Sequence, residues 1–135
     1  MPAIFKTSLA SLAAAFAVAT IAGAASAQEI KRTEIKRSDL TGTNMEVIMS
    51  IVEIPPGAVL QRHIHYGEEA FYVLEGAMTE LPGTPPQALA RVPGTGGINV
   101  REVPHAGYKV TGDKALKLLT VHIVDKGKPL AVNVP

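Results

Sequence analysis

Cysteine is absent from all 135 residues, which rules out disulfide bonds and every metal or redox motif that depends on thiolates. The same absence argues against a lipid anchor, because such an anchor would need a cysteine where a leader is cleaved. A chain of this size still buries about two-thirds of its unfolded surface. We therefore expect one domain that a hydrophobic core holds together without cross-links.

An excess of basic charge is also missing, since 13 Lys and Arg stand against 12 Asp and Glu. Removing residues 1–27, the leader proposed below, takes away Lys6 alone and leaves a formal net charge of zero. A neutral domain without a basic stripe offers nothing for a phosphate backbone to bind, so nucleic acid is excluded as a partner. The sequence contains no Ser-His-Asp arrangement and no phosphate-binding glycine loop either.

No apolar run is long enough to cross a bilayer, which takes about 20 residues. The run from Leu9 to Ala22 is shorter and consists mostly of weakly hydrophobic alanine. With Lys6 before it and Ala25-Ser26-Ala27 after it, this run is more typical of a secretory signal peptide than of a membrane anchor. We expect cleavage after Ala27, a periplasmic or secreted location, no membrane attachment after cleavage, and a single mature domain over residues 28–135.

Helical periodicity is missing from this mature chain, where no segment repeats apolar residues every 3.6 positions. Segment 45–54 is apolar on both parities, which predicts a strand buried on both faces. The charged segment 29–37 predicts an edge strand or an arm, and the proline- and glycine-rich segment 82–97 a long irregular connection. Further strands are expected at 69–74, 77–81, 99–103, 107–111 and 116–124, and Pro129 and Pro135 indicate a loose tail. The sequence predicts an all-β sandwich or barrel.

Polar ligand-type residues gather in one place, at His63, His65 and Glu69. Residues i and i+2 of a strand point to the same side, so both imidazoles should face one way. Gly67 predicts a tight turn after them, and the returning strand would bring Glu69 within about 5 Å of the same site. Imidazole and carboxylate are ordinary ligands of Zn, Fe, Mn, Ni and Cu. Three such side chains left unpaired inside a barrel would be costly to bury, which favours a metal over a bare polar rim.

This stretch resembles the first motif of the cupin superfamily, in which glycine, two histidines, glutamate and a second glycine recur at set spacings. The matching residues are Gly57, His63, His65, Glu69 and Gly76. The resemblance implies a jelly roll, or double-stranded β-helix, that closes into a barrel. It also implies that the 29–37 arm could lie across a partner subunit in a homodimer.

The second cupin motif matches only partly. With His105 in its histidine position, Gly94 also agrees, while Val100, Glu102 and Lys109 depart from the pattern. The resemblance implies His105 as the fourth ligand. His122 is the alternative, although its place in the apolar strand 116–124 favours a core histidine satisfied by a hydrogen bond.

The sequence therefore predicts a cupin that binds one divalent transition metal through His63, His65, Glu69 and His105. Phe71 shares the parity of Glu69, as does Val73, and should make the pocket largely apolar, whereas Glu68 and Arg62 should face away. We expect a small organic substrate or ligand. The resemblance implies a metal-dependent enzyme, with dioxygenation, decarboxylation, isomerisation or lysis as candidate reactions. A non-catalytic cupin that binds a small molecule or metal is the alternative, and a structural zinc is a third possibility.

Overall fold

The structure, a computed structural model, describes residues 29–81, 90–105 and 107–135. These residues form strands and turns and no helix, so the all-β prediction is confirmed for them. Among them there is likewise no helix that could cross a membrane. The strands are β1 (Lys31–Asp39), β2 (Met45–Ile54), β3 (Val59–Leu60), β4 (His63–Ile64), β5 (Gly67–Glu75), β6 (Ala77–Glu80), β7 (Ala90–Arg91), β8 (Gly96–Asn99), β9 (Tyr108–Thr111), β10 (Leu116–Asp125) and β11 (Val132–Asn133).

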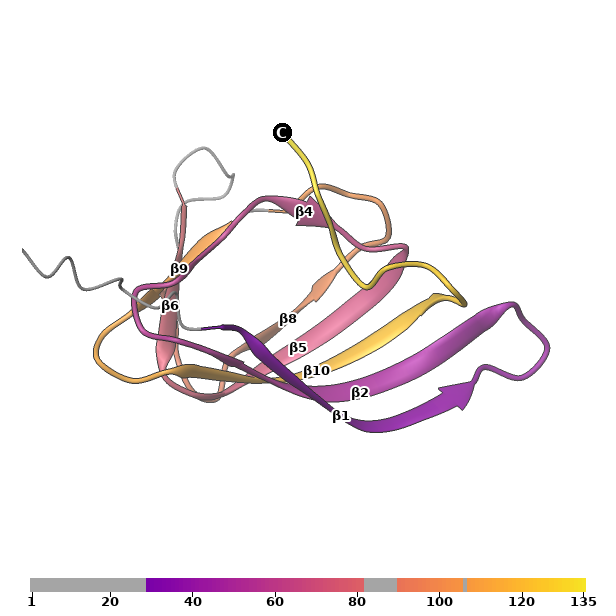
Figure 1. Ribbon diagram of the computed structural model, residues 1–135, viewed down its shortest axis with the longest axis horizontal. Coiled ribbons are helices and arrows are strands. Elements are labelled where there is room, and N and C mark those ends of the chain that lie inside the picture. Colours follow the sequence, from indigo (N-terminus) through magenta and orange to yellow (C-terminus); the bar gives the residue numbers. More distant parts are fainter. Residues whose placement is uncertain (1–28, 82–89, 106) are drawn as a thin grey trace, which may run out of the picture.

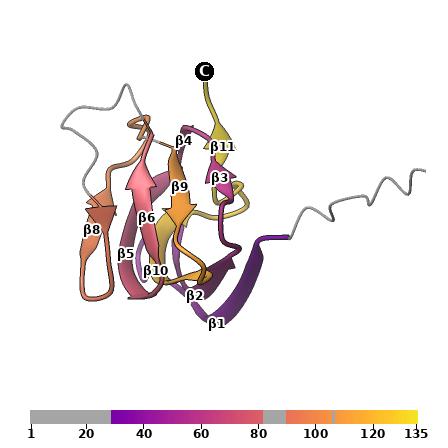
Figure 2. The ribbon, with the colours of Figure 1, turned by 90° about the vertical axis from the view of Figure 1, so that its left-hand side faces the viewer.

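The strands form two main antiparallel sheets that face one another across the core. The larger sheet has the order β1-β2-β10-β5-β8, and the smaller has the order β3-β9-β6-β7. A third, two-stranded sheet pairs β11 with β4. In Figure 1 the larger sheet lies below and β4 lies above it; Figure 2 shows β6 and β9 in front of β5 and β10.

The longest strands, β2 and β10, alternate strictly between buried and partly exposed residues. On β10 every second residue from Leu116 to Val124 is buried. On β2 the outward residues are half-buried and Met49 is 36% exposed, so the prediction that 45–54 is buried on both faces was wrong. The reason is that the second sheet covers only the inner face. The apolar core cluster is Val52, Ile54, Val73, Met78, Val110, Leu116 and Leu118, and each such side chain contributes about 1.5–3 kcal/mol on burial.

The inner face of the large sheet changes from apolar to polar along its strands. On β10, the buried residues run from Leu116 and Leu118 to Thr120 and His122. Ser50 of β2 pairs with Thr120 and continues the polar row. The barrel interior therefore has an apolar end that stabilises the fold and a polar end that can carry chemistry.

The predicted hairpin that joins His65 to Glu69 is not formed. Gly67 is the first residue of β5 rather than part of a hairpin turn, and β5 pairs with β10 and β8. A Cβ atom on Gly67 would lie 2.0 Å from the carbonyl oxygen of Ile123, so glycine is needed for close approach of two strands. β4 pairs instead with β11.

Two further predictions need correction in the second half of the chain. The strand expected at 99–103 ends at Asn99, and a turn follows in which Glu102 has a φ of 55°. The C-terminal tail, predicted to be loose, contributes β11 to the fold. Of the connection 82–97, residues 82–89 lie outside the described part, and the rest contains β7 and the start of β8.

Candidate metal centre

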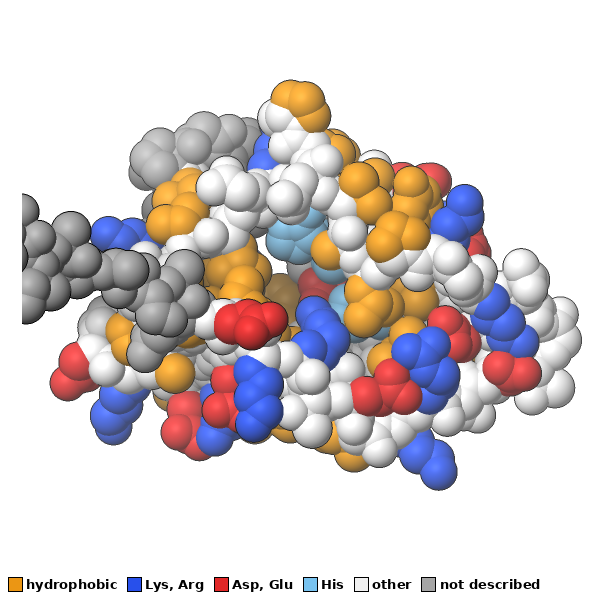
Figure 3. All heavy atoms as spheres, in the orientation of Figure 1, with side chains coloured by type: hydrophobic (Ala, Val, Ile, Leu, Met, Phe, Trp, Pro, Cys, Tyr) orange, Lys and Arg blue, Asp and Glu red, His pale blue; other side chains and the backbone are white. Residues whose placement is uncertain are grey.

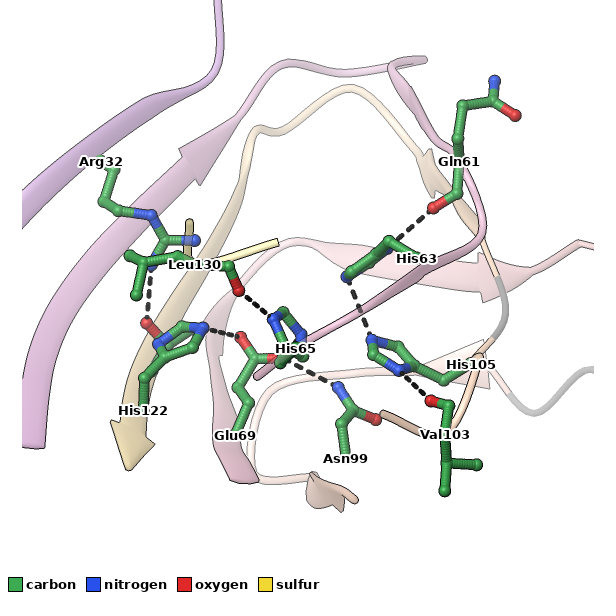
Figure 4. A network of polar contacts seen from close by, with 11 residues as sticks. Arg32, Gln61, His63, His65, Glu69, Asn99, Val103, His105, His122 and Leu130 are labelled. Carbon is green, nitrogen blue, oxygen red and sulfur yellow. Dashed lines mark hydrogen bonds and ion pairs between the residues drawn. The ribbon is translucent and has the colours of Figure 1, made fainter. Parts of the chain in front are cut away.

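Two histidines far apart in sequence meet through a backbone bridge. His63 donates its N–H to the carbonyl of His105 at 3.4 Å, and His105 donates to the carbonyl of His63 at 3.1 Å. This antiparallel bridge places both imidazoles on one side, with their Nε2 atoms 3.0 Å apart (Figure 4). The bridge thus brings the sequence-predicted ligand His105 beside His63, at the end of the barrel that β4 covers.

Each of these histidines has its other ring nitrogen against a backbone carbonyl. His63 Nδ1 lies 2.8 Å from the oxygen of Gln61, and His105 Nδ1 lies 3.2 Å from the oxygen of Val103. A carbonyl can only accept, so Nδ1 carries the proton in both rings and Nε2 carries a lone pair. Two lone pairs 3.0 Å apart repel one another unless a cation lies between them.

His65 has the same arrangement, deeper in the barrel. Its side chain is 2% exposed, and its Nδ1 donates to the carbonyl oxygen of Leu130, just before β11. Its Nε2 lies 2.9 Å from Glu69 Oε2, yet forms no aligned hydrogen bond with any described residue. One ring nitrogen each of His63, His65 and His105 lies within 4.8 Å of the others. An orphaned buried nitrogen beside two further imidazoles is a donor set that fits a divalent transition metal.

Glu69 is 8% exposed and ionised. Burial alone would raise its pKa, but His65, His122 and the amide of Asn99 lower the pKa to about 2. Asn99 donates to Glu69 Oε2 at 2.8 Å, and His122 Nε2 lies 3.3 Å from Oε1. The negative charge of Glu69 would attract a bound cation, and the side-chain amide of Asn99 holds the carboxylate in place.

His122 differs from its prediction. It is fully buried, but neither ring nitrogen has a hydrogen-bond partner among the described residues, so the expectation of a satisfied core histidine was wrong. It forms a second group of possible ligands with His65 and Glu69. Its place on β10 directly opposite Glu69 of β5 explains the contact.

Burial keeps three of the four histidines neutral. It lowers the pKa of His122 to about 4, and burial together with the neighbouring His63 lowers the pKa of His105 to about 4. Burial also lowers the pKa of His63. His65 is the exception, because the carboxylate of Glu69 outweighs the effect of burial and raises its pKa. Neutral imidazole is the form that binds metals.

The site opens into a cavity of about 530 Å³ between the sheets, seen as the hollow in Figure 3. Phe71 lines the cavity as predicted, Val73 lies in the core, and Glu68 and Arg62 are exposed. Sequence reasoning missed several residues at or near the site, because they come from other parts of the chain: Arg32, Asn99, Tyr108, Thr120 and Leu130. Their only signal was strand parity, which cannot be used until the pairing is known.

Comparison with known proteins gives the family. The ChrR cupin-like domain family matches residues 17–88, more than half of the chain. The chain belongs to this cupin family. The match begins ahead of the cleavage site expected after Ala27. No curated protein matches this cupin.

Solved structures with the same fold share little sequence with this cupin. The polyketide cyclase RemF from Streptomyces resistomycificus is 21% identical over 80% of this chain and 72% of that chain, with a TM-score of 0.61. The DMSP lyase DddQ from Ruegeria pomeroyi is 19% identical over 83% of this chain and 55% of that chain, with a TM-score of 0.60. A chain in the complex of SigE with the anti-sigma ChrR from Rhodobacter sphaeroides is 19% identical over 69% of this chain and 44% of that chain, with a TM-score of 0.52. These likenesses concern the fold.

Proposed function

We propose that this cupin binds one divalent transition metal ion through His63, His65, Glu69 and His105. The observation that carries the proposal is the orientation of the three imidazoles. Each has Nδ1 against a backbone carbonyl. Nε2 of His63 lies 3.0 Å from that of His105, Nε2 of His65 lies 2.9 Å from Glu69 Oε2, and one ring nitrogen of each histidine lies within 4.8 Å of the others. The lowered pKa of His105, about 4, argues against a proton as the cation between these nitrogens at neutral pH.

We further propose that the metalloprotein is an enzyme acting on a small organic substrate. A bound Fe, Mn, Zn, Ni or Cu ion would supply Lewis acidity or oxygen activation. The chain itself supplies a cavity of about 530 Å³ next to the ligand residues, within the size range of small-molecule sites. Its apolar residues can contact the hydrocarbon part of a substrate, and Asn99 keeps the carboxylate of Glu69 directed at the histidines. Among candidate reactions, RemF and DddQ supply a cyclase and a lyase as precedents on this fold.

The second candidate is a non-catalytic cupin that binds metal or a metabolite. It is supported by the family match, because ChrR is an anti-sigma protein in the solved complex with SigE. The same ligand residues would serve either role. Turnover of a substrate is therefore the property that separates the two candidates.

Elemental analysis of protein purified without an affinity tag tests the metal site. We expect close to one equivalent of a single transition metal per chain and less than a tenth of that in a His63→Ala, His105→Ala double variant. An Arg62→Ala variant, altered in an exposed neighbour of His63, is the matched control and should keep its metal. Substoichiometric metal in the parent protein, or equal metal in the double variant, would reject the site.

We also propose that the protein is exported and mature from Gln28. The support is the sequence of residues 1–27, which lie outside the described residues. N-terminal sequencing of protein from a periplasmic or culture fraction should begin at Gln28. Sedimentation of the same sample tests the homodimer, for which the exposed edge strand β1 is the candidate contact.

A further inference from the structure

An arginine from the edge strand faces the cavity beside the ligand residues. Arg32 of β1 pairs with Val52 of β2, and Val52 pairs with Leu118 of β10. Directly paired residues share a face of the sheet, and Val52 and Leu118 are buried on the inner face. Arg32 therefore points inward, and its guanidinium donates to Thr120 Oγ1 at 3.1 Å.

Arg32 lacks the carboxylate partner that three of the other four described arginines have. Arg91, which also lines the cavity, is paired with Glu80 at 3.1 Å, and Arg37 is paired with Glu46 at 2.6 Å. Within the described residues Arg32 makes no ion pair, and Thr120 takes one of its five N–H donors. A guanidinium with free donors at a cavity wall is suited to bind an oxyanion.

A neutral donor and apolar surfaces lie on the same cavity. Tyr108 lines it, and burial together with the negative charge of Glu69 raises the pKa of its hydroxyl, so this group stays a donor. Phe71 lies opposite Thr120 on β5, and Val52 and Leu118 complete an apolar wall next to the guanidinium. The cavity thus offers donors at one end and hydrocarbon along its length.

We propose that Arg32 binds the carboxylate of a small, otherwise apolar monocarboxylic acid, whose body lies against Val52, Phe71 and Leu118. This inference rests on the proposed function, because it assigns the substrate class of the same cavity. The carboxylate would lie near Thr120, close to the ligand residues, and Tyr108 would add a second donor. Neutral hydrocarbons would make no use of the free guanidinium donors, and dianions would place a second charge on the apolar wall.

Calorimetric titration with two matched probes tests the inference. Cyclohexanecarboxylate and cyclohexanecarboxamide have nearly the same shape and differ in charge. On zinc-loaded protein at pH 7 we expect the carboxylate to bind at least about tenfold more tightly than the amide, since hydrogen bonds to charged groups are the stronger ones. Arg32→Gln should bring the ratio of the two affinities close to one, and Arg32→Lys should restore part of it.

The control is Lys31→Gln, which removes the same charge from the neighbouring residue on the opposite face of β1 and should keep the preference. Melting curves and cobalt absorption spectra of each variant check that fold and metal are retained. If Arg32→Gln keeps the preference, if the parent binds both probes equally, or if it binds neither, the inference is wrong.

Repeating the titration on metal-free protein separates the inference from the proposed function. A carboxylate preference that depends on Arg32 without metal would support the substrate class even if the metal site failed. A preference for the carboxylate probe that needs zinc but not Arg32 would mean that the metal ion binds the carboxylate. That outcome would overturn the role of Arg32 and leave the proposed metal site intact.

Discussion

At the scale of single residues, the candidate centre depends on backbone carbonyls as much as on side chains. The oxygens of Gln61, Leu130 and Val103 hold one ring nitrogen of His63, His65 and His105 respectively. Each carbonyl selects the tautomer that has its proton on Nδ1, so Nε2 keeps a lone pair with which it can bind a metal. These three histidines are therefore preorganised by parts of the chain that carry no chemistry of their own.

His105 and His122 can be distinguished by their effect on metal affinity. His105→Ala should weaken zinc binding by at least about 100-fold because it removes a ligand. His122→Ala should weaken it by about tenfold, because His122 acts through the carboxylate of Glu69. Competition with a chromophoric chelator measures both values. Equal losses would place His122 among the ligands.

The buried His122 should make the metal-free protein sensitive to mild acid. Its pKa is about 4 in the folded state against an ordinary value of 6.5. Between these values the unfolded chain binds more protons, so stability falls as pH is lowered from 6.5 to 4, at a rate approaching about 1.4 kcal/mol per pH unit. Urea unfolding at several pH values should show a shallower dependence for His122→Gln. Parallel curves for the two proteins would contradict this account.

At the scale of elements, close contact between β5 and β10 aligns Glu69 with His122. The contact starts at Gly67, which lies against the backbone of Ile123 and Val124. At the other side of the site, β11 pairs with β4, which places the carbonyl of Leu130 against the ring of His65. Two element pairings thus position the deeper half of the centre.

Gly67→Ala tests the first of these pairings. The added methyl would lie 2.0 Å from Ile123 O, so the strands must separate, and we expect a loss of about 3 kcal/mol or more in the free energy of unfolding. Gly127→Asn is the control, because Gly127 has a φ of 74° and open space around it, a conformation that asparagine tolerates. Its loss should stay below about 1 kcal/mol. Denaturant unfolding of both variants provides the comparison, and a tolerated Gly67→Ala would refute the packing argument.

At the scale of the whole molecule, the barrel separates stability from chemistry along its length. One end is filled by the apolar core, and the other holds buried Ser50, Thr120, His65, Glu69 and His122. Burying so many polar groups lowers stability unless they find partners. A metal would satisfy several of them together and so couple ligand binding to folding.

Metal removal should therefore lower the melting temperature. A ligand that binds only the folded state adds about 4 kcal/mol at 1,000 times its dissociation constant, which corresponds to a rise of more than about 10 °C in a domain of about 100 residues. Calorimetry before and after chelation, followed by zinc addition, measures the shift. The His63→Ala, His105→Ala double variant should show almost none. A metal-independent melting temperature in the parent would exclude the proposed coupling.

Much of the fold was determined by the sequence alone. Apolar runs bounded by turn residues placed β2, β9 and β10 within a residue or two of their bounds, because both are local properties. The spacing of His63, His65 and Glu69 marked the polar centre for the same reason. Export and the homodimer stay predictions.

Only the tertiary structure decided how that centre is assembled. The bridge between His63 and His105, the pairing of β4 with β11, and the arrival of Arg32, Asn99 and Leu130 all join residues tens of positions apart. Strand parity says which side a residue faces but not which strand lies beside it. That choice depends on packing of the two sheets around a shared core, so a histidine assigned to the core became part of the site.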